Sequence, residues 1–253
     1  MSDSNQRRIL HSLNKLRLVL SYLPYFRSKD SIRFVAWANK HYGPFGKKQR
    51  VDVMLSSARF LNINRPISGH YFEFGSHGAN TIRYAWKYLN HLIDGLYVAF
   101  DSFEGLPEVS EKDKSTIFFK GNLSTPIETF RRLATKGNGI PHSKLMTVQG
   151  FYSETLNQIT ADLFGSKKAA VIYVDCDLYE SAVDVLNFSL GFLQHGTVLI
   201  FDDWNCYSAS PELGERRAFE EFSKSQHRYS FVPFFSSAEI QAFICQDLEN
   251  AHG

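Results

Sequence analysis

The sequence predicts an α/β fold with a seven-stranded, mostly parallel sheet that has helices on both faces. From about His70 onward, short runs rich in β-branched and aromatic residues alternate with helical stretches, as in a covered parallel sheet. One run, Ala169–Asp175, is continuously apolar, which is typical of a strand buried on both faces. The last two runs are separated by only four residues, SSAE, and this spacing predicts an antiparallel hairpin.

Each strand can be assigned in chain order from these runs. The five parallel strands are expected at Tyr71–Gly75, Leu96–Asp101, Lys144–Gly150, Ala169–Asp175 and Gly196–Asp202. The antiparallel hairpin is expected to pair Tyr229–Phe235 with Ile240–Gln246. A helix from about Tyr179 to Gln194 connects the fourth and fifth strands.

Residues 1–66 differ from this pattern and predict a helical N-terminal extension, followed by one domain over residues 67–253. The segment is punctuated by Pro24, Pro44 and Pro66, and its first helix has an apolar stripe beside four basic residues. Such a stripe packs on the domain or on a second subunit. A helix lying on a membrane surface is the alternative. We expect the extension to act as a lid or in dimerisation, and the chain to form a homodimer.

The composition narrows the class of protein. Apolar residues make up 43% of the chain, charged residues 21%, and the formal net charge is +2, which indicates a globular protein without a nucleic-acid partner. The three cysteines are scattered, which argues against structural zinc and a secreted disulfide framework. No apolar stretch reaches the roughly 18 residues of a transmembrane helix. We therefore expect a cytoplasmic protein without a transmembrane segment.

The long polar region Ser102–Thr125 predicts a lid or a binding loop. A disordered excursion without function is the alternative. Before this loop, the first strand runs into FEFGSHGANT, where Glu73 precedes a turn at Gly75 and a helix that opens with free N–H groups for an anionic ligand. A dinucleotide site would need G-x-G-x-x-G, but His77 and Ala79 occupy the second and third glycine positions.

Carboxylates also follow the second, fourth and fifth strands. Asp101 is placed to hold a ribose diol, or to cap a helix. Asp175, Asp202 and Asp203 converge if the fourth and fifth strands are neighbours, and a hard cation such as Mg²⁺ would relieve their repulsion. The alternative is helix capping and solvation of the three side chains. Cys176 and His195 do not complete a zinc site.

Taken together, these motifs resemble a class I S-adenosylmethionine-dependent methyltransferase with a Rossmann-like fold. More narrowly, the chain is similar to the macrocin O-methyltransferase family, which includes sugar O-methyltransferases of the mycinamicin and novobiocin pathways. The resemblance covers about Val53 to Phe222 and rests on FEFG, DSFEGLP, QGFYSETL, VDCDLYES and FDDWN.

The resemblance implies S-adenosylmethionine as the methyl donor and Mg²⁺ as a second cofactor. The implied cofactor-binding residues are Glu73, Gly75, Ser76, Thr81, Asp101, Ser102, Gly150, Phe151, Tyr152 and Asp175. The implied magnesium ligands are Asp175, Asp202 and Asp203, with Asp202 also as the general base. Catechol O-methyltransferases, which are similar in these ligands, have a lysine base three residues beyond the first Asp, where this chain has Leu178.

We therefore expect a magnesium-dependent O-methyltransferase that moves the methyl group of S-adenosylmethionine to a sugar hydroxyl of a glycoside or glycan precursor. The alternative acceptor is a catechol or another phenolic small molecule, favoured by the aromatic-rich composition. A nicotinamide-dependent oxidoreductase is disfavoured because the chain lacks G-x-G-x-x-G and the three aspartates would have no use. A non-catalytic scaffold is disfavoured because Glu73 and all three aspartates are present.

Overall fold

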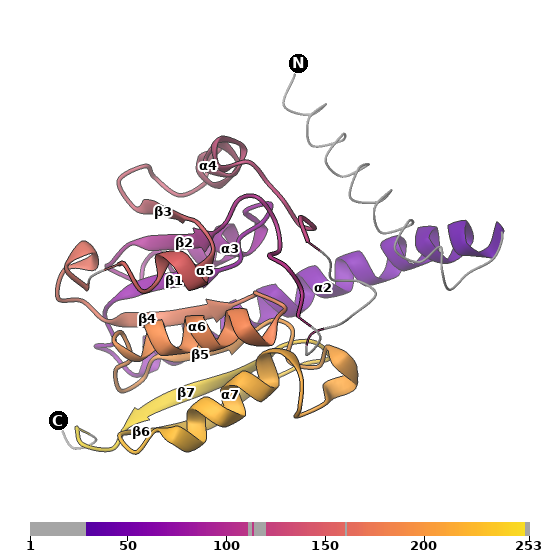
Figure 1. Cartoon of the computed structure of the whole chain (residues 1–253). Helices are drawn as coiled ribbons and strands as arrows, with labels where there is room; N and C mark the ends of the chain where they lie inside the picture. Colours follow the sequence, from indigo (N-terminus) through magenta and orange to yellow (C-terminus); the bar gives the residue numbers. More distant parts are fainter. Residues whose placement is uncertain (1–28, 111–112, 114–119, 160, 251–253) are drawn as a thin grey trace. The chain divides into compact units, whose positions relative to one another are not determined.

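The computed structural model describes residues 29–110, 113, 120–159 and 161–250, and these contain the expected seven-stranded sheet. Its strands lie in the order β3-β2-β1-β4-β5-β7-β6 (Figure 1). Their bounds are β1 His70–Phe74, β2 Tyr97–Asp101, β3 Leu145–Gln149, β4 Ala169–Val174, β5 Val198–Phe201, β6 Tyr229–Ser236 and β7 Gln241–Asp247. β1 to β5 are parallel, while β7 pairs antiparallel with both β5 and β6. The predicted fold class and terminal hairpin are thus confirmed.

Helices pack on both faces of this sheet (Figure 1). They are α2 Lys29–Ile63, α3 Asn80–Leu89, α4 Ile127–Thr135, α5 Tyr152–Thr155, α6 Tyr179–Leu190 and α7 Gly214–Ser225, with short 3₁₀ turns at Ala161–Phe164 and Tyr207–Ala209. Buried side chains of α3, α4 and the last part of α2 form one core on one face. Those of α6 and α7 form the other.

The alternation of side chains along a strand explains how one sequence serves both cores. In β1, Tyr71 belongs to the core under α3, whereas Phe72 and Phe74 belong to the core under α6, because successive strand residues point to opposite faces. The second core is rich in phenylalanine, and the rings of Phe74 and Phe100 stack with their centroids 4.4 Å apart. This double burial accounts for the nearly continuous apolar runs of the central strands.

The strand order places β1 between β2 and β4, so the chain changes direction across the sheet at β1. In register, Phe74 lies opposite Phe100 of β2 and Val174 of β4. The loops that follow these strands therefore leave the same edge side by side. In open parallel sheets this crevice is where ligands bind.

The N-terminal region is less simply divided than the sequence suggested. Packing separates the chain into residues 1–48 and residues 49–253, so the division falls inside α2. Pro44 lies within this helix and does not end it, since an interior proline removes one backbone hydrogen bond and can bend a helix without terminating it. The basic, apolar-striped first helix lies outside the described residues, and the boundary expected at residue 66 stays a prediction.

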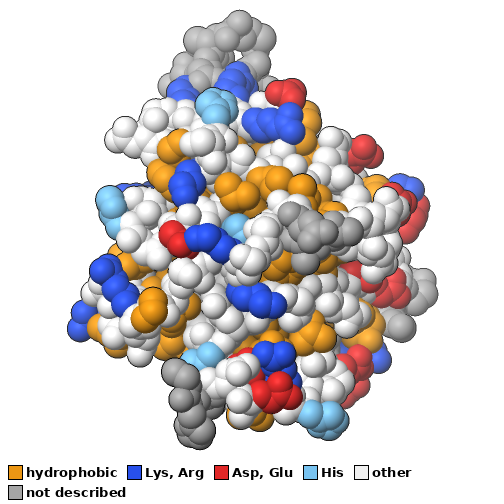
Figure 2. Space-filling view, turned by 90° about the vertical axis from the view of Figure 1, so that its left-hand side faces the viewer, with side chains coloured by type: hydrophobic (Ala, Val, Ile, Leu, Met, Phe, Trp, Pro, Cys, Tyr) orange, Lys and Arg blue, Asp and Glu red, His pale blue; other side chains and the backbone are white. Residues whose placement is uncertain are grey.

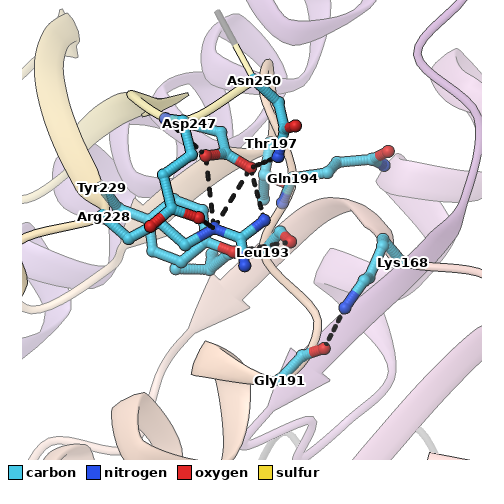
Figure 3. A network of polar contacts seen from close by, with 10 residues as sticks. Lys168, Gly191, Leu193, Gln194, Thr197, Arg228, Tyr229, Asp247 and Asn250 are labelled. Atoms are coloured by element: carbon cyan, nitrogen blue, oxygen red, sulfur yellow. Dashed lines mark hydrogen bonds and ion pairs between the residues drawn. The ribbon is translucent and has the colours of Figure 1, made fainter.

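At the sheet edge opposite the crevice, a polar network ties the strand ends together (Figure 3). Arg228 contacts Asp247 with an Nη2–Oδ2 distance of 2.7 Å, and Lys168 donates to the carbonyl of Gly191. On the face shown in Figure 2, lysine and arginine side chains are interspersed with acidic and apolar ones. Within the described part of the chain, no helix combines the length and the apolar character that a bilayer span requires.

Candidate active site

A cleft opens at the carboxyl ends of β1, β2, β3 and β4 and holds about 560 Å³ of space, including its open mouth. Its lining residues are Gly75, His77, Asp101, Ser102, Gly105, Leu106, Pro107, Leu123, Gly150, Phe151, Tyr152, Asp175, Cys176, Asp177 and Ser181. Seven of the ten residues expected to bind a cofactor are among them, so four separate motifs of the sequence meet at one cavity.

Gly75 makes the turn that opens this cleft. Its φ is +85°, and a Cβ at this position would lie 1.7 Å from the backbone oxygen of Asp175. Only glycine therefore allows the chain leaving β1 to pass so close to the chain leaving β4. This close approach brings the first motif and the aspartate motif into contact.

Asp101 organises the backbone of the cleft floor. Its Oδ2 accepts the N–H groups of Ser76 and His77 at 2.8 and 3.1 Å, and its Oδ1 accepts the N–H of Phe103 at 2.6 Å. Three backbone bonds fix the carboxylate in place and leave lone-pair capacity on Oδ1. The expected contact with a ribose diol stays a prediction, and the geometry leaves room for it.

Three of the expected cofactor residues lie beneath the cleft and not on its surface. Glu73, Ser76 and Thr81 are buried, and the cavity lining does not include them. Glu73 accepts the hydroxyl of Tyr71 at 2.6 Å, and burial, assisted by the charge of Asp202, raises its pKa to about 8. The assignment of these three residues as cofactor-binding residues stays a prediction.

The loop after β3 forms another wall. The Gly150 N–H donates to the carbonyl of Asp101 at 3.0 Å, and the Tyr152 hydroxyl donates to the carbonyl of Phe100 at 3.2 Å. Phe151 and Tyr152 thereby present aromatic surface to the cleft, as a planar base requires.

The long loop expected to be a lid is tied down at both ends. Leu106 and Asn122 pair through their backbones, as do Gly121 and Leu106, at 2.9 Å each. A ring nitrogen of His77 lies 2.6 Å from the carbonyl of Leu123. Between these ends Asp113 is buried and accepts the N–H of Tyr179 at the start of α6. The two ends of the loop thus border the cleft.

The three expected magnesium ligands do lie near one another, because β4 and β5 are neighbours as anticipated. Burial, together with the charges of Asp202 and Asp203, raises the pKa of Asp175 well above its ordinary range. Burial and Asp202 likewise raise the pKa of Asp203 to about 6. Such mutual repulsion between buried carboxylates is relieved by a cation.

A cation from the chain itself meets this cluster. The guanidinium of Arg50, from the end of α2 that packs on the sheet, forms an ion pair with Oδ2 of Asp202. The hydroxyl of Tyr173 donates to the other carboxylate oxygen, Oδ1. Both oxygens of Asp202 therefore have a partner, and Asp202 is almost fully buried.

Consistent with this pairing, no three His, Cys, Asp or Glu side chains of the described residues converge as a ready metal site. The donor set nevertheless suits Mg²⁺ chemically, since it consists of carboxylate oxygens and the charge of Asp202 raises the pKa of both Asp175 and Asp203. The assignment of Asp175, Asp202 and Asp203 as metal ligands stays a prediction.

Glu215, in the first turn of α7, joins the two aspartate motifs. Its Oε1 accepts the N–H of Cys176 at 3.0 Å, and its Oε2 accepts the N–H of Asp203 at 3.1 Å. The side chain is fully buried, so both bonds are shielded from water. One carboxylate thus sets the separation between the loop after β4 and the loop after β5.

Sequence reasoning missed Arg50, Tyr173 and Glu215. Arg50 lies 152 residues from its partner, and no spacing or periodicity connects the two. In the sequence, nothing distinguishes Tyr173 from the other residues of its buried strand. Glu215 had one signal, because an acidic residue in the first turn of a helix often meets free N–H groups; here the N–H groups belong to other loops.

The match to a family model defines the class of protein: this is an S-adenosylmethionine-dependent O-methyltransferase. The family model for macrocin-O-methyltransferase (TylF) matches residues 37–228. The chain belongs to this family.

Solved structures show the same fold. The O-methyltransferase NovP is 21% identical, with a TM-score of 0.61 over 78% of this chain and 79% of that chain. The calicheamicin methyltransferase CalS11 is 18% identical, with a TM-score of 0.62 over 92% and 91%. An apo structure of CalS11, described as a TDP-rhamnose 3′-O-methyltransferase, is 15% identical, with a TM-score of 0.54 over 92% and 93%. A comparison with curated proteins gives no match.

Proposed function

We propose that this enzyme transfers the methyl group of S-adenosylmethionine to a sugar hydroxyl of a glycoside or glycan precursor, with Mg²⁺ as a cofactor. The observation that carries the proposal is the carboxylate cluster of Asp175, Asp202 and Asp203 beside the cofactor cleft. The family and the description of CalS11 as a TDP-rhamnose methyltransferase support a sugar acceptor.

The transfer is a displacement at the methyl carbon. The acceptor oxygen bonds to that carbon while the carbon–sulfur bond breaks, and the electron pair stays on sulfur to give S-adenosylhomocysteine. The reaction needs the acceptor oxygen held within about 3–3.5 Å of the methyl group. The hydroxyl proton passes to the carboxylate of Asp202, the base in this proposal.

Asp175, Asp202 and Asp203 would hold the metal ion, which when bound would lower the pKa of the acceptor hydroxyl and orient neighbouring oxygens. Tyr173 supports the role of Asp202 by orienting its carboxylate. The Tyr173 hydroxyl donates to Oδ1 of Asp202, and Oδ2 then faces Arg50. Glu215 supports it by holding the two loops at a fixed separation.

Replacing the base tests this assignment. We expect Asp202→Asn to lower turnover by at least about 100-fold, because an amide cannot accept the proton. The affinity for S-adenosylmethionine, measured by calorimetry, should stay within about threefold, which corresponds to less than 1 kcal/mol. Asp94, at the opposite edge of the sheet, accepts the N–H of Gly69 and pairs with Lys167. Asp94→Asn is the matched control and should stay active. Unchanged turnover in Asp202→Asn would refute the base, and full activity in excess chelator would refute the metal.

The acceptor class is tested by a substrate panel of nucleotide sugars and glycosides against catechols. The catechol alternative lacks its base here, because Leu178, at the position of the lysine, is apolar and buried. We expect turnover with a sugar acceptor and none with catechol. Methylation of catechol alone would reverse the assignment of the acceptor while leaving the cofactor site intact.

A further inference from the structure

Arg50 lies outside the sequence motifs described above, yet it contacts Asp202, one of the expected magnesium ligands. It comes from the part of α2 that packs on the sheet, and its guanidinium reaches across to Oδ2 of Asp202. The Arg50 side chain is 30% exposed, whereas that of Asp202 is 3% exposed. The pair therefore joins a partly exposed cation to a buried anion.

Asp202 lies in a cluster of several carboxyl groups, whereas Arg50 contributes a single positive charge. Burial raises the pKa of Asp175, Asp177 and Glu215, and the negative charges of Asp202 and Asp203 raise it further. Arg50 opposes this negative charge, and its own pKa is raised by Asp202 and Asp175 despite the opposing effect of burial. The guanidinium thus acts on Asp175 and Asp203 as well as on Asp202.

We infer that Arg50 is the resident counter-ion of this cluster and competes with a divalent cation for Asp202. The inference rests on the magnesium dependence proposed above. A Mg²⁺ ion binds carboxylate oxygen at about 2.0–2.1 Å, and a guanidinium nitrogen at about 2.8 Å, so the two cations on one oxygen would lie less than about 5 Å apart. Their repulsion in a buried site requires Arg50 to withdraw when the metal binds.

The structure gives Arg50 a route for this withdrawal. Its side chain is 30% exposed, and its long, flexible stem can carry the guanidinium outward into water once a metal ion replaces it on Asp202. Tyr173 can stay in place, because its hydroxyl is neutral and holds the other oxygen of Asp202. Arg50 is therefore a positioning residue that sets the affinity of the cluster for the cation.

The test is Mn²⁺ binding, followed by electron paramagnetic resonance, to the full-length protein and its variants. Arg50→Gln keeps a hydrogen-bond donor and removes the charge, whereas Arg50→Lys keeps the charge. We expect Arg50→Gln to bind Mn²⁺ at least about tenfold more tightly than the wild type, and Arg50→Lys to stay within about threefold. Arg59→Gln, an exposed position on the same helix, should match the wild type.

A second measurement uses the wild type and does not depend on any variant folding. Phenylglyoxal modifies accessible arginine side chains, and the modification of Arg50 is read by peptide mass spectrometry. If Mn²⁺ displaces Arg50, its modification should become several-fold faster when Mn²⁺ is added, while that of Arg59 should not change.

The outcomes separate this inference from the function on which it rests. Equal Mn²⁺ affinity in the wild type and Arg50→Gln, or unchanged modification of Arg50 in a protein that binds Mn²⁺, overturns the competition and leaves magnesium dependence standing. Absence of Mn²⁺ binding in the wild type and every variant overturns both. Tighter Mn²⁺ binding in Arg50→Gln, but not in Arg50→Lys or Arg59→Gln, supports the competition between Arg50 and the metal ion.

Discussion

At the scale of single residues, Glu73 places an ionisable group in an apolar interior. Its carboxyl is fully buried, and desolvation, with a smaller effect of the Asp202 charge, raises its pKa to about 8. In the unfolded chain a glutamate has a pKa of about 4.3. Between these two values the folded protein holds a proton that the unfolded chain releases, so this residue lowers the free energy of unfolding as the pH rises from about 4.3 to 8.

Replacing this carboxyl by an amide should remove that pH dependence. Glu73→Gln has the same shape, stays neutral, and can still accept the Tyr71 hydroxyl through its amide oxygen. We expect its free energy of unfolding relative to the wild type to increase from pH 5.5 to pH 8 by on the order of 1 kcal/mol per pH unit. Urea denaturation of cofactor-free protein at both pH values measures this, and an equal difference at both would contradict the assigned pKa.

The residues whose positions the sequence predicted well are those that end strands. Asp101, Asp175 and Asp202 follow recognisable apolar runs, and the parallel sheet then brings their backbones to one edge. Arg50 and Glu215 escaped prediction for the opposite reason. Their roles arise from contacts with elements that are distant in the sequence. No local sequence pattern around either residue indicates which residue it will contact.

At the scale of elements, α7 does more than cover the sheet. It begins at Gly214, whose φ is +58°, and this turn places Glu215 under the loops that follow β4 and β5. The geometry of the aspartate cluster therefore depends on how α7 docks, since the same carboxylate bonds the backbone of both loops.

Glu215→Gln tests this dependence. The new amide nitrogen cannot accept a hydrogen bond, so the N–H of Cys176 or Asp203 would face a donor, at a cost of about 1–3 kcal/mol. We expect a loss of stability in this range, and a fall in turnover larger than the change in cofactor affinity. Denaturation, steady-state kinetics and calorimetry measure the three quantities.

The matched control is Glu220→Gln on the same helix. Glu220 forms a half-exposed pair with Arg216 at 3.1 Å, and such a pair contributes no more than about 0.5 kcal/mol. If Glu215→Gln behaved like this control in both stability and turnover, Glu215 would not be holding the two loops together.

The positions of the strands were easier to predict from the sequence than the bounds of the N-terminal helix. All seven strands lie within a few residues of their expected bounds, because apolar runs bounded by polar turns are a strong local signal. Pro44 was a weaker indicator of where a helix ends, since it lies inside α2. A proline constrains its own turn of helix, but the residues on either side decide whether the helix continues, and here they continue it.

At the scale of the whole molecule, the cleft in which we expect the cofactor to bind belongs entirely to residues 49–253. Each of its lining residues, both cores and the Arg50–Asp202 pair fall within that unit. Residues 1–48 form a separate unit, which leaves dimerisation or acceptor coverage as its predicted role. These two roles make different demands on a truncated chain.

Deletion of residues 1–48 should therefore leave a folded protein that binds S-adenosylmethionine but no longer forms the expected homodimer. The retained part of α2 keeps Arg50, Val53 and Met54, so the core under α3 stays filled. We expect cofactor affinity within about threefold of the full chain, because nothing that lines the cleft is removed. Calorimetry measures the affinity, and sedimentation velocity measures the oligomeric state. A truncated chain that stays dimeric but loses turnover with large acceptors would assign the N-terminal unit to the acceptor site instead.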